Sequence, residues 1–387
     1  MNQKELEIYI HIPFCIKKCS YCDFLSAPAT EQTVESYMAA LFAEIGGRAK
    51  DYSDRTVTSI FIGGGTPSLL SGEQIGQLMD RIREQFAMAQ DAEITMEVNP
   101  GTASAEKLRN FYTAGINRLS IGMQSAQAEE LKNLGRIHDF EGFCQVYREA
   151  VEAGFTNINV DIMSGLPGQT LASYRDTLEK VLHLEPMPQH ISAYSLIVEE
   201  GTPFAAMAER GELPLPEEET ERAMYEETIE VLAKYGFHRY EISNYARDGY
   251  ECRHNVGYWI RRDYLGFGIG AASLIDNVRF QNEKSLGAYL AHPLESREEE
   301  QTLTVQDRME ETMFLGLRLT RGVSCVDFAE QYGRTVEEVY GEVIARNVAD
   351  GLLTVTERKE NQKKDRLLAL TKRGLDLSNY VMAQFLF

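Results

Sequence analysis

The sequence lacks the features that would place the protein in a membrane, outside the cell or on nucleic acid. No apolar run approaches the roughly 18 residues that span a bilayer, and the first residues contain no basic segment followed by an apolar stretch, as a secretory signal would. Basic side chains are outnumbered, because 39 Lys and Arg stand against 59 Asp and Glu and leave a net charge of −20. An acidic chain offers little attraction to phosphate backbones or anionic lipids. We therefore expect a cytoplasmic protein with no membrane segment and no nucleic-acid partner.

Cysteine is also scarce, and its placement is uneven. Six cysteines in 387 residues are too few for the disulfide framework of a small secreted domain. Three of them, Cys15, Cys19 and Cys22, crowd into eight positions. The remaining three are scattered over the rest of the chain. This asymmetry indicates a metal centre near the N-terminus.

The rest of the composition is that of a globular protein with a sizeable core, since 43% of the residues are hydrophobic and 25% are charged. Six short apolar or alternating runs predict strands, at residues 7–14, 59–65, 93–100, 117–125, 157–167 and 190–197. Amphipathic helical patterns lie between them, at residues 34–49, 105–115, 143–154 and 173–184. This alternation predicts an α/β fold, a partial (β/α)6 barrel of parallel strands whose functional side chains lie at the C-terminal strand ends.

The last third of the chain follows a different pattern. The charged run ESREEEQ, residues 295–301, predicts a linker. Beyond it we expect three helices, then a hairpin over residues 352–371 and a last helix, which together resemble a winged-helix module. The acidic context argues against DNA binding by this module. We therefore divide the chain into a barrel (1–235), a barrel extension with the linker (236–300) and a small, mostly helical, winged-helix-like C-terminal domain (301–387).

The three N-terminal cysteines form a C-x3-C-x2-C pattern directly after the first predicted strand. A zinc site usually takes four nitrogen or sulfur ligands, often as two C-x2-C pairs, and the sequence has no second pair. Three thiolates suit a [4Fe–4S] cluster whose fourth iron stays open to an outside ligand, although the spacing differs from both ferredoxin patterns. Three buried or zinc-bound cysteines are the alternative.

These cysteines and three further motifs resemble a known family. CIKKCSYCDF at 15–24, GGGTPSLL at 63–70, GMQS at 122–125 and DIMSGLPGQT at 161–170 resemble the radical S-adenosylmethionine (SAM) superfamily. They are similar to its branch that contains oxygen-independent coproporphyrinogen III oxidase and the HemW-type heme chaperones. The resemblance implies that Cys15, Cys19 and Cys22 hold a [4Fe–4S] cluster whose fourth iron chelates SAM. It implies SAM contacts from Tyr9, Tyr21, Gly64, Gly65, Thr66, Glu97, Gln124, Arg136 and Asp161.

The chemistry of these residues suits the roles that the resemblance gives them. A glycine turn lets a ligand approach the backbone, and a carboxylate such as that of Glu97 can bind both hydroxyls of a ribose. Taken one at a time, each is equally compatible with a structural ion pair or cap. In the superfamily, one electron reaching the cluster cleaves SAM and gives a radical that abstracts hydrogen, while the protein binds and orients the reactants.

Two details separate the branches. The oxidases carry a further cysteine two residues after the third ligand and a long N-terminal extension, whereas this chain has Phe24 there and fourteen residues before Cys15. The segment HNVGYW contains the H-N-x-x-Y-W pattern associated with heme binding in the HemW type. His254 would be an axial ligand of the iron, and Tyr258 and Trp259 would offer flat apolar surface to a porphyrin. The alternative is a hydrogen-bonded core histidine beside a packed aromatic pair.

The resemblance therefore favours a heme chaperone without coproporphyrinogen oxidase activity, and the competing function is that oxidase. Its partners would be heme or a porphyrin, an apoprotein that accepts heme, and an electron donor such as a flavodoxin or ferredoxin. Cys252 is an alternative thiolate ligand or a buried thiol. Because porphyrin propionates are anionic, they would need local cations such as Arg253, Arg261 or Arg262. The sequence leaves the oligomeric state open, and an open cluster with an exposed porphyrin site would favour a homodimer.

Overall fold

The six apolar runs predicted as strands are strands, and each pairs in parallel with the next along the chain. The structure is a computed structural model that describes residues 4–295, 297–360 and 363–387. The inner strands of a parallel sheet are buried, and all seven residues of the fourth strand are buried. The strands are β1 Lys4–Ile12, β2 Arg55–Gly64, β3 Ala87–Val98, β4 Arg118–Gln124, β5 Ile158–Ser164 and β6 His190–Ser195.

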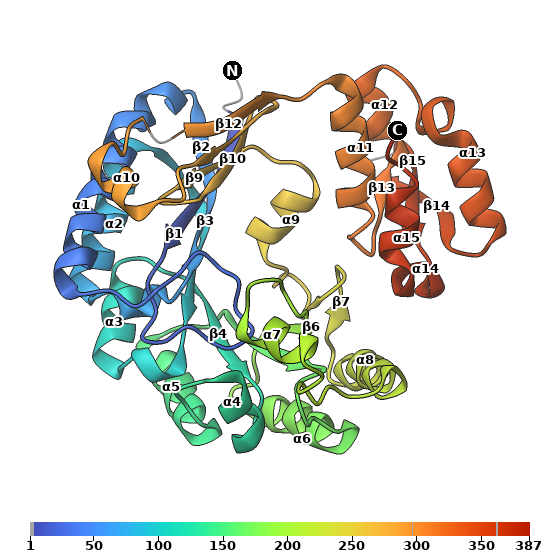
Figure 1. The fold of residues 1–387 in the computed structure, drawn as a ribbon. Helices are drawn as coiled ribbons and strands as arrows, with labels where there is room; N and C mark the ends of the chain where they lie inside the picture. Colours follow the sequence, from blue (N-terminus) through green and yellow to red (C-terminus); the bar gives the residue numbers. More distant parts are fainter. Residues whose placement is uncertain (1–3, 296, 361–362) are drawn as a thin grey trace.

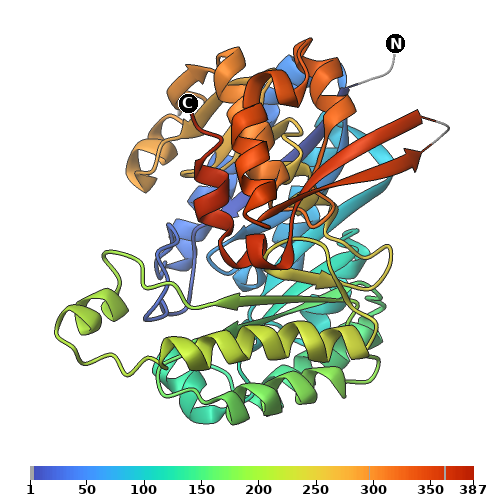
Figure 2. The same ribbon diagram turned by 90° about the vertical axis from the view of Figure 1, so that its right-hand side faces the viewer.

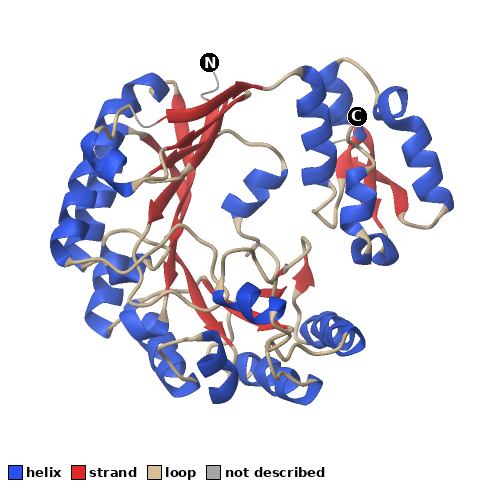
Figure 3. Cartoon of the chain, viewed as in Figure 1, coloured by secondary structure: helices blue, strands red, loops and turns tan. Residues whose placement is uncertain are grey.

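Helices follow these strands and cover the outer face of the sheet, as Figures 1 and 3 show. Gly115 and Gly154, which lie just after two of these helices, have φ of +95° and +111° and so occupy the left-handed positions that glycine favours. Three single-turn 3-10 helices are η1 Ala49–Tyr52, η2 Pro67–Leu69 and η3 Pro100–Thr102. The α-helices here are α1 Glu31–Arg48, α2 Gly72–Gln85, α3 Ala105–Thr113, α4 Ala128–Leu134, α5 Phe140–Ala153, α6 Leu171–Leu182, α7 Pro203–Glu209 and α8 Glu218–Lys234.

Further strands extend the sheet at both edges, so that it forms an open arc. Beside β6 lie β8 Asn244–Ala246 and β7 His238–Arg239, and beside β1 lie β9 Tyr264–Phe267, β10 Ala272–Ile275, β11 Val278–Asn282 and β12 Arg297–Thr302. Among the described residues no strand pair closes the ring, which agrees with the expected partial barrel. The short helix α9, Arg253–Trp259, lies on the concave side, and α10, Leu286–Ala291, lies beside α1.

The expectation of a linker over residues 295–301 was wrong. Most of this run is β12, which pairs antiparallel with β11 at the edge of the sheet, and residue 296 lies outside the described part. Every side chain of β12 is exposed to solvent. Charged side chains are tolerated on an edge strand and discourage pairing with other chains, so a charge run does not distinguish a linker from an exposed edge.

The C-terminal part has its own core and a three-stranded sheet in the order β13-β15-β14 (Figure 2). The expected three helices and hairpin are present, although the hairpin turn, residues 361–362, lies outside the described part, and the last helix is split in two. The elements are α11 Val305–Gly316, β13 Val323–Ser324, α12 Cys325–Tyr332, α13 Val336–Ala349, β14 Leu353–Glu360, β15 Lys363–Leu370, α14 Lys372–Asp376 and α15 Ser378–Ala383. Across the part of the chain that the structure covers, none of the helices is long and apolar enough to cross a membrane.

Candidate SAM and iron–sulfur site

A pocket of about 340 Å³ lies at the C-terminal ends of the parallel strands. Barrel-like α/β folds place their functional groups at this end of the sheet. Eleven of the twelve residues predicted for the cluster and SAM line this pocket: Cys15, Cys19, Tyr21, Cys22, Gly64, Gly65, Thr66, Glu97, Gln124, Arg136 and Asp161. Residues from five strands and from the cysteine loop therefore converge on one cavity.

The cysteine loop follows β1 and is anchored to itself at its base. The amide of Cys15 donates to the carbonyl of Ala27 over 3.1 Å, and the three thiols are free and partly exposed. Thr66 Oγ1 lies 3.6 Å from the sulfur of Cys15, and a guanidinium nitrogen of Arg136 lies 3.9 Å from that of Cys19. Donors of this kind stabilise thiolates.

The donor set suits a four-iron cluster. The three free thiols line one cavity, and a cubic cluster takes each protein thiolate on a separate iron. Burial raises the pKa of the Cys22 thiol in the absence of a metal.

Two half-buried carboxyl groups line the pocket. Glu97 lies one residue before the end of β3, and its Oε2 accepts a hydrogen bond of 3.1 Å from the amide of Gly64. Burial, and then the nearby charge of Asp161, raise the pKa of Glu97 to about 8. Asp161, on β5, accepts hydrogen bonds from Asn159 at 2.7 Å and Ser120 at 3.3 Å, and burial raises its pKa as well. Such a pair suits a ligand that brings hydroxyl groups and a positive charge.

The glycine turn after β2 is required by the packing around it. Gly64 has a φ of +109°, and a Cβ on it would lie 2.5 Å from the ring of His11. A Cβ on Gly65 would lie 2.6 Å from the carbonyl oxygen of Phe14. A side chain at either position would push the turn away from the cysteine loop. The turn thus keeps bare backbone facing the pocket.

The opposite wall is built around β4. Gln124 has a φ of +70°, uncommon for a residue other than glycine, and its Oε1 accepts a hydrogen bond of 2.9 Å from the hydroxyl of Tyr194. Arg136 donates to the carbonyl of Gly122 over 2.6 Å, which holds the guanidinium between the strand end and Cys19. The wall thus offers one cation and one fixed amide to a ligand.

The sequence missed two polar residues of this lining that a periodicity argument could have found. Ser120 shares the inward face of β4 with Gly122 and Gln124, since alternate residues of a strand point the same way. Tyr194 lies on β6, a strand that the sequence does predict. Tyr9, expected to contact SAM, is not part of the lining. Its hydroxyl lies 2.9 Å from Nδ1 of His11, deeper in the barrel.

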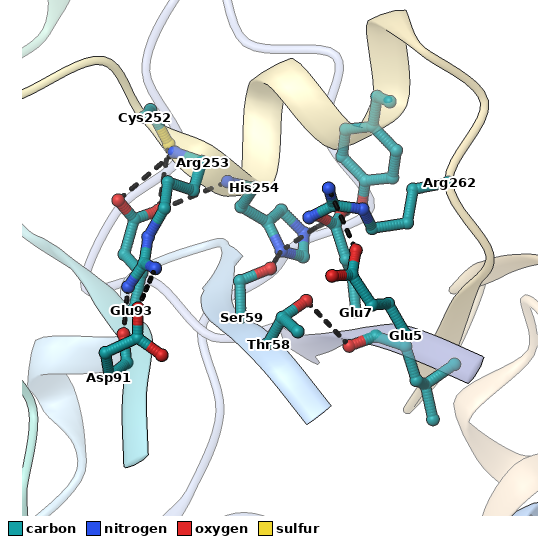
Figure 4. A network of polar contacts seen from close by, with 12 residues as sticks. Glu5, Glu7, Thr58, Ser59, Asp91, Glu93, Cys252, Arg253, His254 and Arg262 are labelled. Carbon is teal, nitrogen blue, oxygen red and sulfur yellow. Dashed lines mark hydrogen bonds and ion pairs between the residues drawn. The ribbon is translucent and has the colours of Figure 1, made fainter. Parts of the chain in front are cut away.

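The HNVGYW segment lies apart from this pocket, on α9. His254 is 1% exposed, and its two ring nitrogens lie 2.9 Å from Ser59 Oγ and 3.1 Å from the hydroxyl of Tyr258 (Figure 4). Burial, and then the charge of Arg118, lower the pKa of His254 to about 3, so the ring is neutral. The other end of the segment faces the C-terminal part, where the guanidinium of Arg318 lies 4.3 Å from the ring centre of Trp259.

The candidate heme-binding groups near this segment are already engaged. Cys252 is fully buried, and its thiol lies 3.5 Å from a carboxyl oxygen of Glu93. Burial raises the pKa of this thiol to about 12. Of the two expectations for Cys252, a thiolate ligand or a buried thiol, the structure agrees with the buried thiol. The three arginines considered for porphyrin propionates are each within 3.0 Å of a carboxylate oxygen: Arg253 of Asp91, Arg261 of Glu311 and Arg262 of Glu5.

A buried acid beside α9 gives the first testable prediction. Glu7, on β1, is fully buried, its Oε2 has no hydrogen-bond partner among the described residues, and burial raises its pKa from 4.5 to about 8 despite Arg262 nearby. A carboxyl whose pKa is raised on folding stabilises the fold fully below its unfolded pKa, and that contribution is lost as the pH rises through the folded pKa. Most of the fall in stability should therefore occur between about pH 4.5 and about pH 8.

Glu7→Gln should remove this fall in stability at higher pH, because the side-chain amide of glutamine resembles the neutral carboxylic acid and does not ionise. We expect the variant to be close to the wild type near pH 5 and to exceed it near pH 9 by about 4 kcal/mol, since the pKa rises from 4.5 to about 8 and one pKa unit corresponds to about 1.4 kcal/mol. Urea unfolding at the two pH values measures the difference. Glu5→Gln is the control, because Glu5 is exposed and also pairs with Arg262. A Glu7→Gln variant less stable than the wild type at both pH values would contradict the prediction.

Comparison with known proteins agrees with this geometry. Residues 9–181 match the Radical SAM superfamily, and residues 303–377 match the HemN C-terminal domain. The chain is 38% identical to "Heme chaperone HemW" of Bacillus subtilis, with 98% of each chain covered, and 36% identical to that of Lactococcus lactis, covering 100% of this chain and 98% of the relative. Among solved structures, the coproporphyrinogen III oxidase HemN of Escherichia coli, described as a radical SAM enzyme, aligns with a TM-score of 0.85 at 28% identity over 99% of this chain and 90% of that one.

Proposed function

The chain belongs to the HemW family of radical SAM proteins, and on this basis we propose that it is a heme chaperone, which binds heme and transfers it to acceptor apoproteins. The observation that carries the proposal is the similarity to HemW relatives over 98% of both chains, barrel and C-terminal part alike. The resemblance to the oxidase HemN is at lower identity, 28%.

The SAM and cluster pocket keeps a binding role in this proposal. Cys15, Cys19 and Cys22 hold a [4Fe–4S] cluster, Glu97 binds the ribose hydroxyls of SAM, and Arg136 lies beside the cluster ligand Cys19. The proposal is supported by the convergence of these five residues on one cavity. When bound, the cluster and SAM supply one-electron chemistry. The chain itself orients SAM on bare glycine backbone and holds the half-buried carboxyl groups of Glu97 and Asp161 against it.

The competing function, coproporphyrinogen III oxidase, is disfavoured by the residue two positions after the third cysteine ligand. Phe24 lines the mouth of the pocket and is 58% exposed, at the position where the oxidase pattern has a further cysteine. A phenyl ring can neither ligate iron nor transfer a proton. Its exposure next to Cys22 offers an apolar surface at the entrance instead.

Partners and location follow from the same proposal. The acceptor is an apoprotein that incorporates heme, and the electron donor is a small redox protein such as a flavodoxin or ferredoxin. The protein acts in the cytoplasm, and a homodimer would cover the open side of the cluster pocket. The domains at 1–235, 236–300 and 301–387 are part of this proposal.

An anaerobic assay on the reconstituted protein separates the two functions. One sample receives coproporphyrinogen III, SAM and a reductant, and a second receives hemin. We expect a stable heme complex by absorbance in the second and no protoporphyrinogen by chromatography in the first. Formation of protoporphyrinogen at catalytic turnover would establish the oxidase instead. The Escherichia coli oxidase HemN, run in parallel, shows that the assay can detect that product.

A further inference from the structure

The helix that carries HNVGYW is fixed to the inner face of the sheet at its first turn. Glu93, on β3, accepts hydrogen bonds from the amides of Arg253 at 3.1 Å and His254 at 3.2 Å, and the thiol of Cys252 lies 3.5 Å away (Figure 4). The first amides of a helix have no partner within the helix, and a buried carboxylate satisfies them well. The start of α9 is therefore held from inside the barrel.

The imidazole of His254 makes the second attachment. Its Nδ1 is bonded to Ser59 on β2, its Nε2 to Tyr258, and its ring centre lies 5.3 Å from that of Phe61 at an angle of 30°. An oxygen of Glu7 on β1 is 3.9 Å from Nδ1. Both ring nitrogens are used, and the residue is 1% exposed. An axial ligand needs a free ring nitrogen with space in front of it for the iron.

The packing of α9 leaves the side of His254 closed. A Cβ at Gly257 would collide with the carboxyl group of Glu7, so the backbone of α9 lies close against this side chain, and His254 itself is 1% exposed. A porphyrin could reach the imidazole only if α9 left the sheet and broke the bonds to Glu93 and Ser59. The imidazole does not fit the role that the motif suggests for it.

We infer that His254 is a positioning residue that fastens α9 inside the open barrel, and that it is not an axial ligand of heme iron. That His254 does not ligate heme iron rests on the proposed function, because it presumes that the protein binds heme. That His254 attaches α9 does not depend on that function. His254 holds the first turn of α9 in place. The last residue of the helix, the half-buried Trp259, then lies beside Arg318 of the C-terminal part.

Hydrogen exchange of the full, heme-free chain tests the attachment. His254→Ala should accelerate amide exchange in residues 253–259 by roughly tenfold or more, because a lost buried hydrogen bond costs about 1–3 kcal/mol. Ser59→Ala, which leaves the imidazole in place, should accelerate the same amides to a smaller extent. His292→Ala removes an exposed histidine and should leave α9 unchanged. Unaltered exchange in both the His254 and the Ser59 variant would overturn the inference.

A hemin titration of the same proteins tests the ligand. The Soret band of bound hemin should lie at the same wavelength in the wild type and in His254→Ala, and free imidazole should not alter it. A band that shifts in His254→Ala, stays in place in Ser59→Ala and returns with imidazole would identify His254 as the ligand. A shift in both variants would also contradict the expected result, because loss of the hydrogen bond to Ser59 would then alter a ligating imidazole. If the wild type binds no hemin, the proposed function fails, and the exchange measurement still decides the role of His254.

Discussion

Replacing Cys15, Cys19 and Cys22 with alanine, together or one at a time, should abolish the iron–sulfur cluster. The three sulfurs line one cavity, and each would ligate a separate iron, so the loss of one leaves a cluster with two protein ligands. Iron and sulfide per chain after anaerobic reconstitution should fall from about four to near zero in the triple variant, with loss of the brown absorbance. The single variants should retain only a small fraction.

The control for this experiment is another free cysteine of the same chain. Cys144 lies on α5, away from the cavity, and Cys144→Ala should retain the full iron and sulfide content. Circular dichroism of the triple variant should match the wild type without its cluster, because the loop is exposed and the core of the sheet does not depend on it. Unchanged iron in the triple variant would refute the assignment of these cysteines.

The strands of the barrel were predictable because their burial imposes a simple pattern. Six apolar or alternating runs become six parallel strands, and residues at their ends meet in one pocket. β12 escaped prediction because an edge strand has no buried face, and its charges resemble those of a linker. Tyr194 was missed although it lies on a predicted strand, and the alternation of that strand places it in the lining, where it donates a hydrogen bond to Gln124.

The surroundings of His254 were beyond the reach of the sequence. The partner of its ring, Ser59, lies 195 residues earlier, and that of its amide, Glu93, lies 161 residues earlier. Neither is a recognisable motif by itself, since a serine and a glutamate within strands are ordinary residues. A histidine next to a Tyr–Trp pair is compatible with a ligand or with a core residue. Only the three-dimensional contacts separate these alternatives.

Glu97→Gln should weaken SAM binding to the reconstituted protein in a way that depends on pH. Burial raises the pKa of Glu97 to about 8 in the free protein, so the carboxyl is largely neutral near pH 6. A cationic ligand that binds the carboxylate lowers that pKa, and binding then releases a proton. Affinity for SAM should therefore rise with pH up to about 8 in the wild type and should rise less in the variant.

The size of the effect follows from the charge lost. A hydrogen bond to a charged group contributes about 1.5–3 kcal/mol, which is roughly a 10- to 100-fold change in affinity. We expect that ratio between wild type and Glu97→Gln near pH 9 and a much smaller one near pH 6, by anaerobic calorimetry. Titration of SAM itself affects both proteins equally and cancels in the ratio.

Two further variants identify the cause of the pH dependence. Glu199→Gln removes another carboxyl group that lines the pocket and should keep the profile of the wild type. Asp161→Asn should move the midpoint of the rise to lower pH, because the charge of Asp161 helps to raise the pKa of Glu97. Asp161→Asn can also change the affinity for SAM at every pH. Only the pH midpoint therefore tests whether the charge of Asp161 raises the pKa of Glu97. A ratio between wild type and Glu97→Gln that stays constant with pH would show that the Glu97 carboxylate does not bind SAM.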